Sequence, residues 1–447
     1  MKVRPLSPNV YLVALSLILA YAVFQSGGIA AVDWDGCMVA LGLVALVYFR
    51  FTSNDDLAPP LQWWLHWPAL LLLIFIGVQL APLPLWLLRA VSPARASLTE
   101  SLQPILPGTG LAPISVFPSA TLAHLLRVAA YTVVFVLTRE LAWRTIENRW
   151  LIVAPLVVIA GAEAAWGVLQ YSPDSTAHGS YINRNHFAGL LELSLPFATV
   201  NPIAALKMRK YESFRHAVVI SISLALAALM ALGVILSLSR GGFIASLASL
   251  IVISFLTPAG RLNDLRRFVT IGFVAAAVIL ASFFLAPDRL ISRFGEIREI
   301  TTDIKPDTRT QVWKDTLRLV ADYPIVGCGL GAFEKAFPKY RTFLPQRAVD
   351  TVYNDYLQFL AELGAIGFAI SAVGMMAVVT SAVRAVLKSG DSTTRHLAIA
   401  SFAALVAIGI HSLTDYNLYI PANAMLLAWI AGVVASLNFG SREVFIT

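Results

Sequence analysis

Four polar clusters stand out in the sequence because their residue types can bind phosphate and move protons. Three of them contain an arginine (Arg184, Arg240 or Arg309), whose permanently charged, planar guanidinium matches phosphate oxygens. With backbone N–H groups that neighbouring glycines leave accessible, these arginines are expected to hold a pyrophosphate. Alternatively, they reach lipid headgroups or pair with acids such as Asp174 and Asp415. The clusters are Asn183-Arg184-Asn185-His186, Ser239-Arg240-Gly241-Gly242, Arg309 to Tyr356, and His411 to Asn417.

Two histidines in these clusters, His186 and His411, are candidate proton acceptors, although a single histidine at a span end is more often an interfacial hydrogen bonder. Glu163 and Glu192 fall inside apolar runs, which is costly unless each acid lines a cavity or has a partner such as Arg127. No histidine or acidic cluster has metal-ligand spacing, so we expect no metal and no other cofactor.

The composition of the rest of the chain predicts a membrane protein. Of 447 residues, 58% are hydrophobic and 13% are charged, whereas soluble proteins have about 25% charged residues. Because a bilayer offers no water to backbone polar groups, the spanning segments should be helices. A β-barrel would alternate in polarity, but these apolar runs are continuous. Basic loops account for the net charge of +7, so we expect no nucleic acid partner.

Twelve apolar runs predict an all-α integral membrane fold with about twelve transmembrane helices. When the chain is threaded from a cytoplasmic N-terminus, the basic loop residues fall on one side, which the positive-inside rule identifies as the cytoplasm. Both termini are then cytoplasmic, and all four polar clusters lie on the opposite face. The runs cover about residues 9–31, 36–51, 64–81, 120–138, 150–171, 186–206, 217–238, 243–258, 268–286, 360–383, 397–413 and 421–438.

Two long loops on that opposite face divide the chain into three parts. Residues 1–286 hold spans one to nine, with a proline-rich loop at about 81–119. Residues 287–357 form a mainly helical loop subdomain, in which Thr308 to Val320 is amphipathic and should form a helix. Residues 358–447 hold spans ten to twelve. The chain shows no internal repeat, which disfavours an inverted-repeat transporter.

The order of these motifs resembles the bacterial O-antigen ligase and O-antigen polymerase superfamily of membrane glycosyltransferases. The resemblance extends from about Pro82 onward and includes the large outer loop between spans nine and ten. No single motif is specific, but their order and their common side make the match. It rests on Asn183 to Ala188, Leu238 to Gly242, Arg309-x-x-x-Trp313, Asp322 to Gly331, Asn354 to Gln358 with Glu362 and Gly364, and His411 to Pro421.

The resemblance implies transfer of a glycan from undecaprenyl diphosphate at the periplasmic face of the bacterial inner membrane. The acceptor is a lipid A core sugar in ligases, a growing repeat unit in polymerases and a protein hydroxyl in some relatives. Because the diphosphate is the leaving group, we expect a metal-independent, inverting enzyme in which Arg184, Arg240 and Arg309 bind the diphosphate. The supporting residues would be Asn183, Asn185, Ser239, Asn354, Asp355 and Asp415.

The sequence departs from the family at the expected catalytic base. Relatives have a histidine directly before the loop asparagine, and often another two residues earlier, where this chain has Tyr353 and Thr351. A tyrosine with a pKa near 10 is a poor base at neutral pH unless neighbouring arginines lower that pKa. Three explanations stay open: Tyr353 is an arginine-activated base, His186 or His411 supplies the base, or the protein binds glycan without transferring it. We expect retained activity, because the arginines are intact.

The sequence therefore predicts a ligase-like glycosyltransferase whose partners are the bilayer, a lipid-linked glycan donor and a glycan or lipid A core acceptor. Its closest rival in the same class is an O-antigen or exopolysaccharide polymerase. A transporter of lipid-linked saccharide would carry polar residues along a path through both leaflets, whereas these clusters lie on one face. A non-catalytic assembly subunit is favoured only by the missing histidine.

Overall fold

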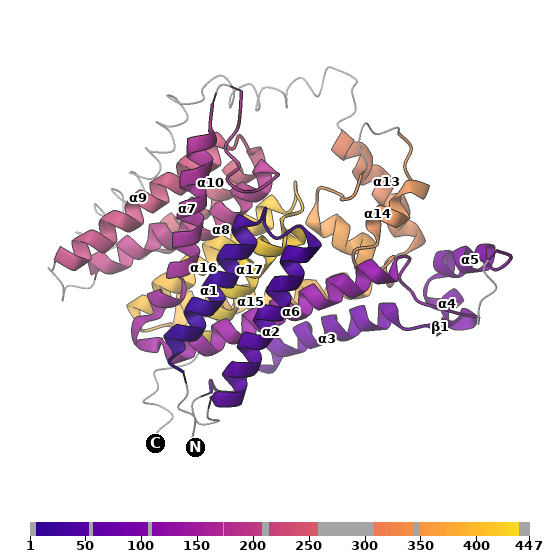
Figure 1. The fold of residues 1–447 in the computed structure, drawn as a ribbon, viewed down its shortest axis with the longest axis horizontal. Coiled ribbons are helices and arrows are strands. Elements are labelled where there is room, and N and C mark those ends of the chain that lie inside the picture. The colour runs from indigo at the N-terminus through magenta and orange to yellow at the C-terminus, as the bar shows by residue number, and fades with distance from the viewer. Residues whose placement is uncertain are drawn as a thin grey trace.

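The computed structural model describes residues 6–52, 57–105, 110–172, 174–207, 214–257, 308–343 and 349–437. Within these ranges the chain is largely helical, and one short antiparallel ribbon pairs β1 (Leu83–Pro84) with β2 (Leu111–Ala112). The helices are α1 (Pro8–Phe24), α2 (Ala31–Phe51), α3 (Trp63–Leu80), α4 (Leu85–Val91), α5 (Pro93–Leu102), α6 (Pro118–Arg144), α7 (Ala154–Gln170), α8 (Arg184–Lys207), α9 (Phe214–Leu236), α10 (Arg240–Leu256), α13 (Thr308–Asp322), α14 (Phe333–Ala336), α15 (Asp355–Lys388), α16 (Ser392–His411) and α17 (Pro421–Leu437), with 3-10 turns η2 (Ile146–Ile152), η3 (Phe337–Lys339) and η4 (Asn417–Tyr419) (Figure 1).

Eleven of the described helices correspond to eleven of the twelve apolar runs in the sequence. Seven are long and apolar enough to cross a membrane, namely α2, α3, α6, α8, α9, α15 and α16. The other four, α1, α7, α10 and α17, are shorter apolar helices. The run at about 268–286 and the first part of the 287–357 loop lie outside the described residues. The predicted all-α membrane fold is confirmed.

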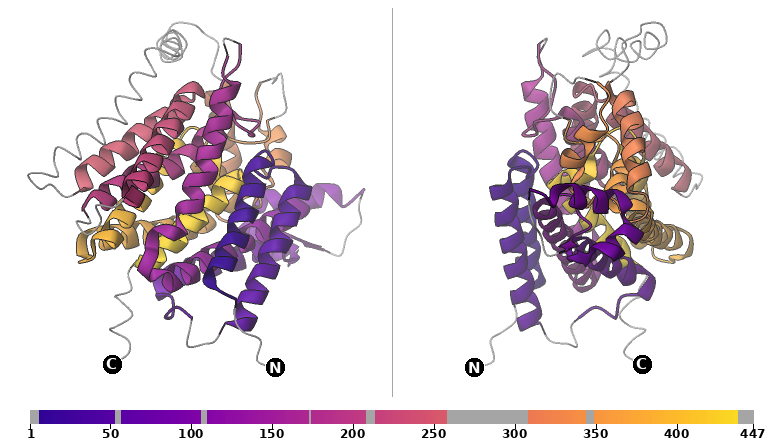
Figure 2. Two further views of the ribbon diagram at one scale, coloured as in Figure 1. Left: turned by 60° about the vertical axis from the view of Figure 1, so that its left-hand side comes forward. Right: turned by 90° about the vertical axis from the view of Figure 1, so that its right-hand side faces the viewer.

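The largest boundary difference lies between the first two runs. Helix α1 ends at Phe24 and α2 begins at Ala31, whereas the hydropathy pattern places this break near residues 31–36. Ser26, Gly27 and Gly28 all have positive φ angles, so the backbone leaves the helix well before the apolar run ends. Figure 2 shows α1 and α2 as a pair along one side of the bundle.

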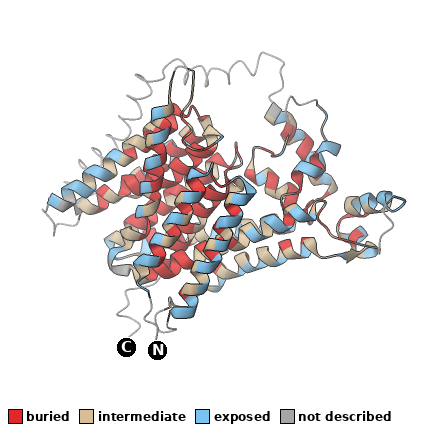
Figure 3. Ribbon diagram, in the orientation of Figure 1, coloured by how far each residue is buried: buried red, intermediate tan, exposed pale blue. Residues whose placement is uncertain are grey.

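Helix α8 forms the centre of the bundle. It packs against α9, α16 and α10, and 94% of its most apolar 18-residue stretch is buried inside the protein. Figure 3 shows buried residues concentrated in this central group, whereas α3 and the nearer surface of α1 and α2 carry many exposed positions. Because the exposed positions of such helices are apolar, they are suited to contact with lipid.

A small helical unit that includes α13 and α14 packs at one end of the bundle. Its apolar core contains Val312 and Leu319 from α13 together with Phe333 and Phe337. Helix α13 covers Thr308–Asp322, which confirms the amphipathic helix expected at Thr308 to Val320. In Figure 1 this unit lies beside the ends of the central helices, at the end of the molecule away from the start of α1.

A glycine-rich segment, Gly327 to Gly331, lies between α13 and α14 and packs against α15. At Gly364 the backbone of α15 breaks, with φ 61° and ψ −172°. The backbone groups near the break bond to the segment before Leu330: Cys328 donates to Ala361, and Gly329 donates to Glu362, each at 3.0 Å. Positive φ angles at Gly327 and Gly364 permit this close approach of two backbones, since a Cβ on either glycine would meet the other strand of chain.

Candidate functional site

Two of the four polar clusters form helix N-termini that carry an arginine. Helix α8 starts at Arg184, and the side chain of Asn183 accepts a hydrogen bond from the Asn185 N–H at 2.9 Å. Helix α10 starts at Arg240, and the Ser239 hydroxyl accepts from the Gly242 N–H at 3.2 Å. These side chains cap the helices, and the remaining N-terminal N–H groups give each end a partial positive charge.

The segment after α16 brings the Asn183 to His186 cluster and Arg309 together around Asp415. This side chain is 1% exposed and accepts a hydrogen bond from Asn185 Nδ2 at 2.5 Å. The Nε2 atom of His186 lies 3.3 Å from Asp415 Oδ1, and Nη2 of Arg309 lies 3.6 Å from Oδ2. Burial raises the pKa of Asp415, but His186, His411 and Arg309 outweigh it and lower the pKa to about 2. Asp415 is therefore an anion that joins α8 to α13.

The spacing of Arg309 and Trp313 follows from their shared face on α13. Residues four apart on a helix point the same way. Arg309 lies over the Tyr353 ring, with 5.0 Å from its guanidinium carbon to the ring centre, and Trp313 Nε1 donates to the Val352 carbonyl at 2.9 Å. Arg309 also donates to the Thr414 carbonyl at 2.8 Å. One turn of α13 therefore positions Tyr353 against the Asp415 segment.

Tyr353 has an unusual backbone conformation and aromatic surroundings. Its φ of 58° is uncommon for a residue with a bulky side chain and marks local strain. Its ring meets the edge of Tyr416 at a centre-to-centre distance of 5.5 Å, and Tyr416 in turn meets His186 at 4.5 Å. Burial and the nearby Asp415 carboxylate raise the pKa of Tyr416, so that phenol stays protonated.

Asn354 and Asp355 hold the same segment from the start of α15. The Asn354 side chain caps α15 by accepting from the Leu357 N–H at 3.0 Å, and its Nδ2 donates to the Leu413 carbonyl at 3.0 Å. Asp355 is buried and accepts from the Ser412 hydroxyl at 2.7 Å. These two residues therefore position the loop after α16.

His411 pairs with an acid that lies deep inside α8. Its Nδ1 lies 2.9 and 3.0 Å from the two carboxylate oxygens of Glu192, and both side chains are buried. The opposite edge of the ring lies against Gly241, where a Cβ would meet His411 Nε2 at 2.9 Å. The glycines of the Ser239 to Gly242 cluster are therefore needed for α10 to approach α16.

The expectation that Arg127 pairs with the acids inside the spans is wrong for both of them. Glu192 bonds to His411, and Glu163 accepts from the Ser180 hydroxyl at 2.6 Å and from the Ser180 N–H at 2.9 Å. The signal for both pairs was present as an acid in an apolar run, but hydropathy does not identify the partner. Arg127 lies elsewhere and lines a separate pocket with His124.

The predicted site residues differ in how far a substrate could reach them. Arg184, Arg240, Arg309 and Tyr353 are half-buried, and the Arg309 side chain is 36% exposed. His186 and His411 are each 1% exposed. The described part of the chain contains no group of three or more histidine, cysteine or acidic side chains that could hold a metal ion. The arrangement can bind an anion and place a phenol beside it.

Comparison with known families identifies part of the chain. Residues 225–372 match the family model described as "O-Antigen ligase". The match includes Arg240, Arg309 and Tyr353, whereas Arg184 and His411 lie outside it. A search of curated proteins found no match.

Proposed function

Since residues 225–372 belong to the O-antigen ligase family, we propose that the protein transfers a glycan from undecaprenyl diphosphate to a sugar hydroxyl, as a ligase does. One observation carries the proposal. Arg309 contacts both Tyr353 and the Thr414–Asp415 segment, so an arginine of the outer loop lies next to the candidate base and the loop that reaches α8.

The donor diphosphate would bind where α8 and α10 begin. Arg184 and Arg240 are the first residues of these helices, so each arginine lies beside backbone N–H groups and the positive end of a helix dipole. Gly241 and Gly242 follow Arg240 and place no bulky side chain at the start of α10. Arg309 would supply the third positive charge. These groups favour the transition state because negative charge grows on the diphosphate as its bond to the sugar breaks.

The acceptor hydroxyl would be activated by Tyr353. Of the three candidate bases, Tyr353 is the one that is half-buried, whereas His186 and His411 are buried and face Asp415 and Glu192. The acceptor oxygen attacks the anomeric carbon, its proton passes to the oxygen of deprotonated Tyr353, which becomes a neutral phenol, and the diphosphate leaves as an anion. Attack opposite the leaving group inverts the anomeric centre. The guanidinium over the Tyr353 ring favours negative charge on that side chain.

We place this site on the periplasmic face and both termini in the cytoplasm. The basic residues of the short loops support this orientation. So does the arrangement in Figure 1, in which the unit containing α13 and α14 lies away from the end where α1 begins. The donor and the acceptor would then meet at the periplasmic face of the membrane.

The test uses the purified full-length protein in lipid vesicles with the undecaprenyl-diphosphate-linked glycan. Release of undecaprenyl diphosphate is measured with a lipid A core acceptor, with the donor glycan itself as acceptor, and without acceptor. We expect release that requires the core acceptor and is lost in Arg240→Ala and Tyr353→Phe, while Arg384→Ala at the far end of α15 behaves like wild type. Release supported by the donor glycan alone would make the protein a polymerase, and no release with any acceptor would overturn transfer.

Full activity in Tyr353→Phe would overturn the assignment of the base while leaving the transferase in place. His186→Ala and His411→Ala then become the informative variants. Because both histidines are buried in the bundle, each variant needs a thermal unfolding measurement beside its activity, so that loss of a base is distinguished from loss of the fold.

A further inference from the structure

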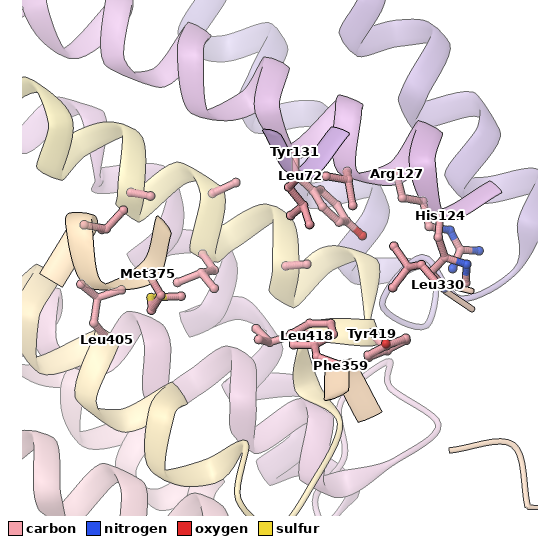
Figure 4. Close-up of a pocket in the computed structure, with 16 residues that line it drawn as sticks. Leu72, His124, Arg127, Tyr131, Leu330, Phe359, Met375, Leu405, Leu418 and Tyr419 are labelled. Atoms are coloured by element: carbon pink, nitrogen blue, oxygen red, sulfur yellow. The ribbon is translucent and has the colours of Figure 1, made fainter. Parts of the chain in front are cut away.

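A pocket with a charged end lies outside the group of helices α8, α10 and α13 that carry the three candidate arginines. It has a volume of about 240 Å³ and is lined by residues of α3, α6, α15, α16 and α17, with none from α8, α10 or α13. Most of its wall is apolar, including Leu72, Val128, Met375 and Leu405. Figure 4 shows His124 and Arg127 together at one end, away from Met375 and Leu405. The pocket is therefore amphipathic along its length.

Arg127 has no anionic partner in the part of the chain that the structure describes. Its Nε is buried without a hydrogen-bond partner, and no described acidic side chain lies within ion-pair distance of it. Two other arginines have acidic partners: Arg139 lies 2.9 Å from Glu140, and Arg309 lies 3.6 Å from Asp415. Since α6 is long and apolar enough to span a membrane, an uncompensated charge within it is costly and indicates an anion.

The direction of the Arg127 side chain places that anion at the end of the pocket. Side chains on a helix lean toward its N-terminus, and Arg127 lies nine residues, about 14 Å, into α6. Its guanidinium therefore extends toward His124, as Figure 4 shows. A guanidinium offers paired donors to phosphate, and the adjacent imidazole adds another polar group.

We infer that this pocket binds an anionic phospholipid of the surrounding bilayer, with its phosphate at Arg127 and His124 and one hydrocarbon chain along the apolar wall. At about 240 Å³ the pocket is smaller than the roughly 300–1,000 Å³ of a site for a drug-sized ligand, which limits it to part of a lipid, such as one chain. Three of the helices that line the pocket, α3, α6 and α15, have only 22% of their apolar stretch buried and face the membrane, so the bilayer can supply the ligand directly. The donor lipid is a less suitable occupant because the arginines proposed for its diphosphate begin α8 and α10.

The bound lipid would also support the back of the candidate site. Leu418 and Tyr419 of η4 line the pocket, while Asp415 and Tyr416 at the start of the same connection belong to the site. The Tyr419 hydroxyl donates to Glu362 at 2.6 Å, and Glu362 accepts from the Gly331 N–H at 2.7 Å. Lipid contact at Tyr419 therefore reaches the glycine-rich segment through two hydrogen bonds.

The experiment measures lipids bound to the purified full-length protein by native mass spectrometry. Phosphatidylglycerol is titrated into delipidated wild type, Arg127→Gln and the pocket-filling variant Ala428→Phe. The control is Arg384→Gln, whose guanidinium lies over Trp64 and lines a different pocket between α3 and α15. We expect one tightly bound lipid in wild type and in Arg384→Gln. Both pocket variants should bind at least about tenfold more weakly, since a charge-assisted pair or the chain contact is lost.

Two further arms decide between occupants and guard against misfolded variants. Undecaprenyl phosphate is titrated against bound phosphatidylglycerol, and zwitterionic phosphatidylethanolamine is titrated into wild type alone. Equal binding by wild type and both pocket variants, or no preference for the anionic lipid in wild type, would overturn the inference. Displacement by undecaprenyl phosphate that is lost in the pocket variants would also overturn it, because the site would then belong to the carrier lipid. Wild-type headgroup preference remains decisive even if a variant fails to fold.

Discussion

Helices α8 and α3 have similar hydropathy but opposite surroundings. The most apolar 18-residue stretch has a mean hydropathy of 1.3 in α8 and 1.6 in α3. In α8, 94% of this stretch is buried inside the protein, whereas in α3 only 22% is buried. On α3, Trp63, Leu71 and Ile74 are exposed large apolar residues. On α8, the buried residues include His186 and Glu192. Hydropathy alone therefore does not distinguish a central helix from one that faces lipid.

The two helices also use their polar residues differently. The polar groups of α8 face other helices, and Glu192 reaches His411 of α16. Helix α3 has a buried amide near its end, Gln79, whose Nε2 donates to the Val326 and Glu362 carbonyls and whose Oε1 accepts from the Leu330 N–H. The central helix thus joins charged groups to the site, while the peripheral helix supports the glycine-rich segment that packs against α15.

The strongest change should be in the rate of glycan transfer, and it should distinguish the central cluster from the peripheral surface. Arg309→Ala removes contacts to Tyr353, Thr414 and Asp415 and should reduce glycan transfer by about 10²–10³-fold, the scale of losing one charge-stabilising donor. Arg384→Ala on α15 should change the rate by less than twofold. Initial rates at saturating donor test this. Equal loss in both variants would mean that basic charge in general, rather than the Arg309 position, supports activity.

A second prediction concerns the free energy of unfolding, which should respond differently to substitutions on α8 and on α3. Glu192→Ala leaves His411 Nδ1 without its partner in a buried position and opens a small cavity, so it should cost about 3 kcal/mol. Ile74→Ala on α3 removes an exposed contact and should cost less than about 0.5 kcal/mol. Reversible unfolding in detergent measures both. Glu192→Gln keeps a hydrogen-bond acceptor and should lie between them.

Substitutions of two glycines should have opposite effects on stability, one on α3 and one in the glycine-rich segment that α3 supports. Gly327 has a φ of 71°, and a Cβ there would meet the backbone of Glu362, so Gly327→Ala should cost about 2–3 kcal/mol. Gly77 on α3 has nothing within 4 Å of an added Cβ, and Gly77→Ala should stabilise its helix by about 0.5–1 kcal/mol. The same unfolding assay compares them, and a destabilising Gly77→Ala would contradict the open surface of α3.

The pH dependence of the Asp415 cluster should be a smaller effect than the loss of Glu192 or the change at Gly327. The folded-state pKa of Asp415, about 2, lies below the ordinary value of 3.8. Ionised Asp415 therefore stabilises the folded state above about pH 4, and this contribution of about 2 kcal/mol should be lost as the pH falls toward 2. Unfolding of wild type and Asp415→Asn between pH 2 and 7 measures it. The variant should lack this part of the acid dependence, and parallel curves would contradict the paired carboxylate.

Local pattern was sufficient to predict most of the helices. Continuous apolar runs identify α3, α6, α9 and α17 because a bilayer-spanning backbone must bond to itself. The amphipathic period identifies α13. The clustering of polar residues at predicted helix ends also indicated which segments contribute to the candidate site. The early end of α1 was missed, since positive φ angles at Ser26, Gly27 and Gly28 overrode an apolar run.

Which polar groups meet could not be predicted from the sequence, because it depends on how the helices pack. Arginine, histidine and acid types were visible in the sequence, but Glu192 with His411, and Asp415 with Arg309, join residues more than one hundred positions apart. The sequence by itself determined where the chain enters helices and which residue types lie at their ends, because those depend on neighbours along the chain. Pairing depends on which helix lies at the centre, and that follows from packing surfaces that hydropathy does not encode.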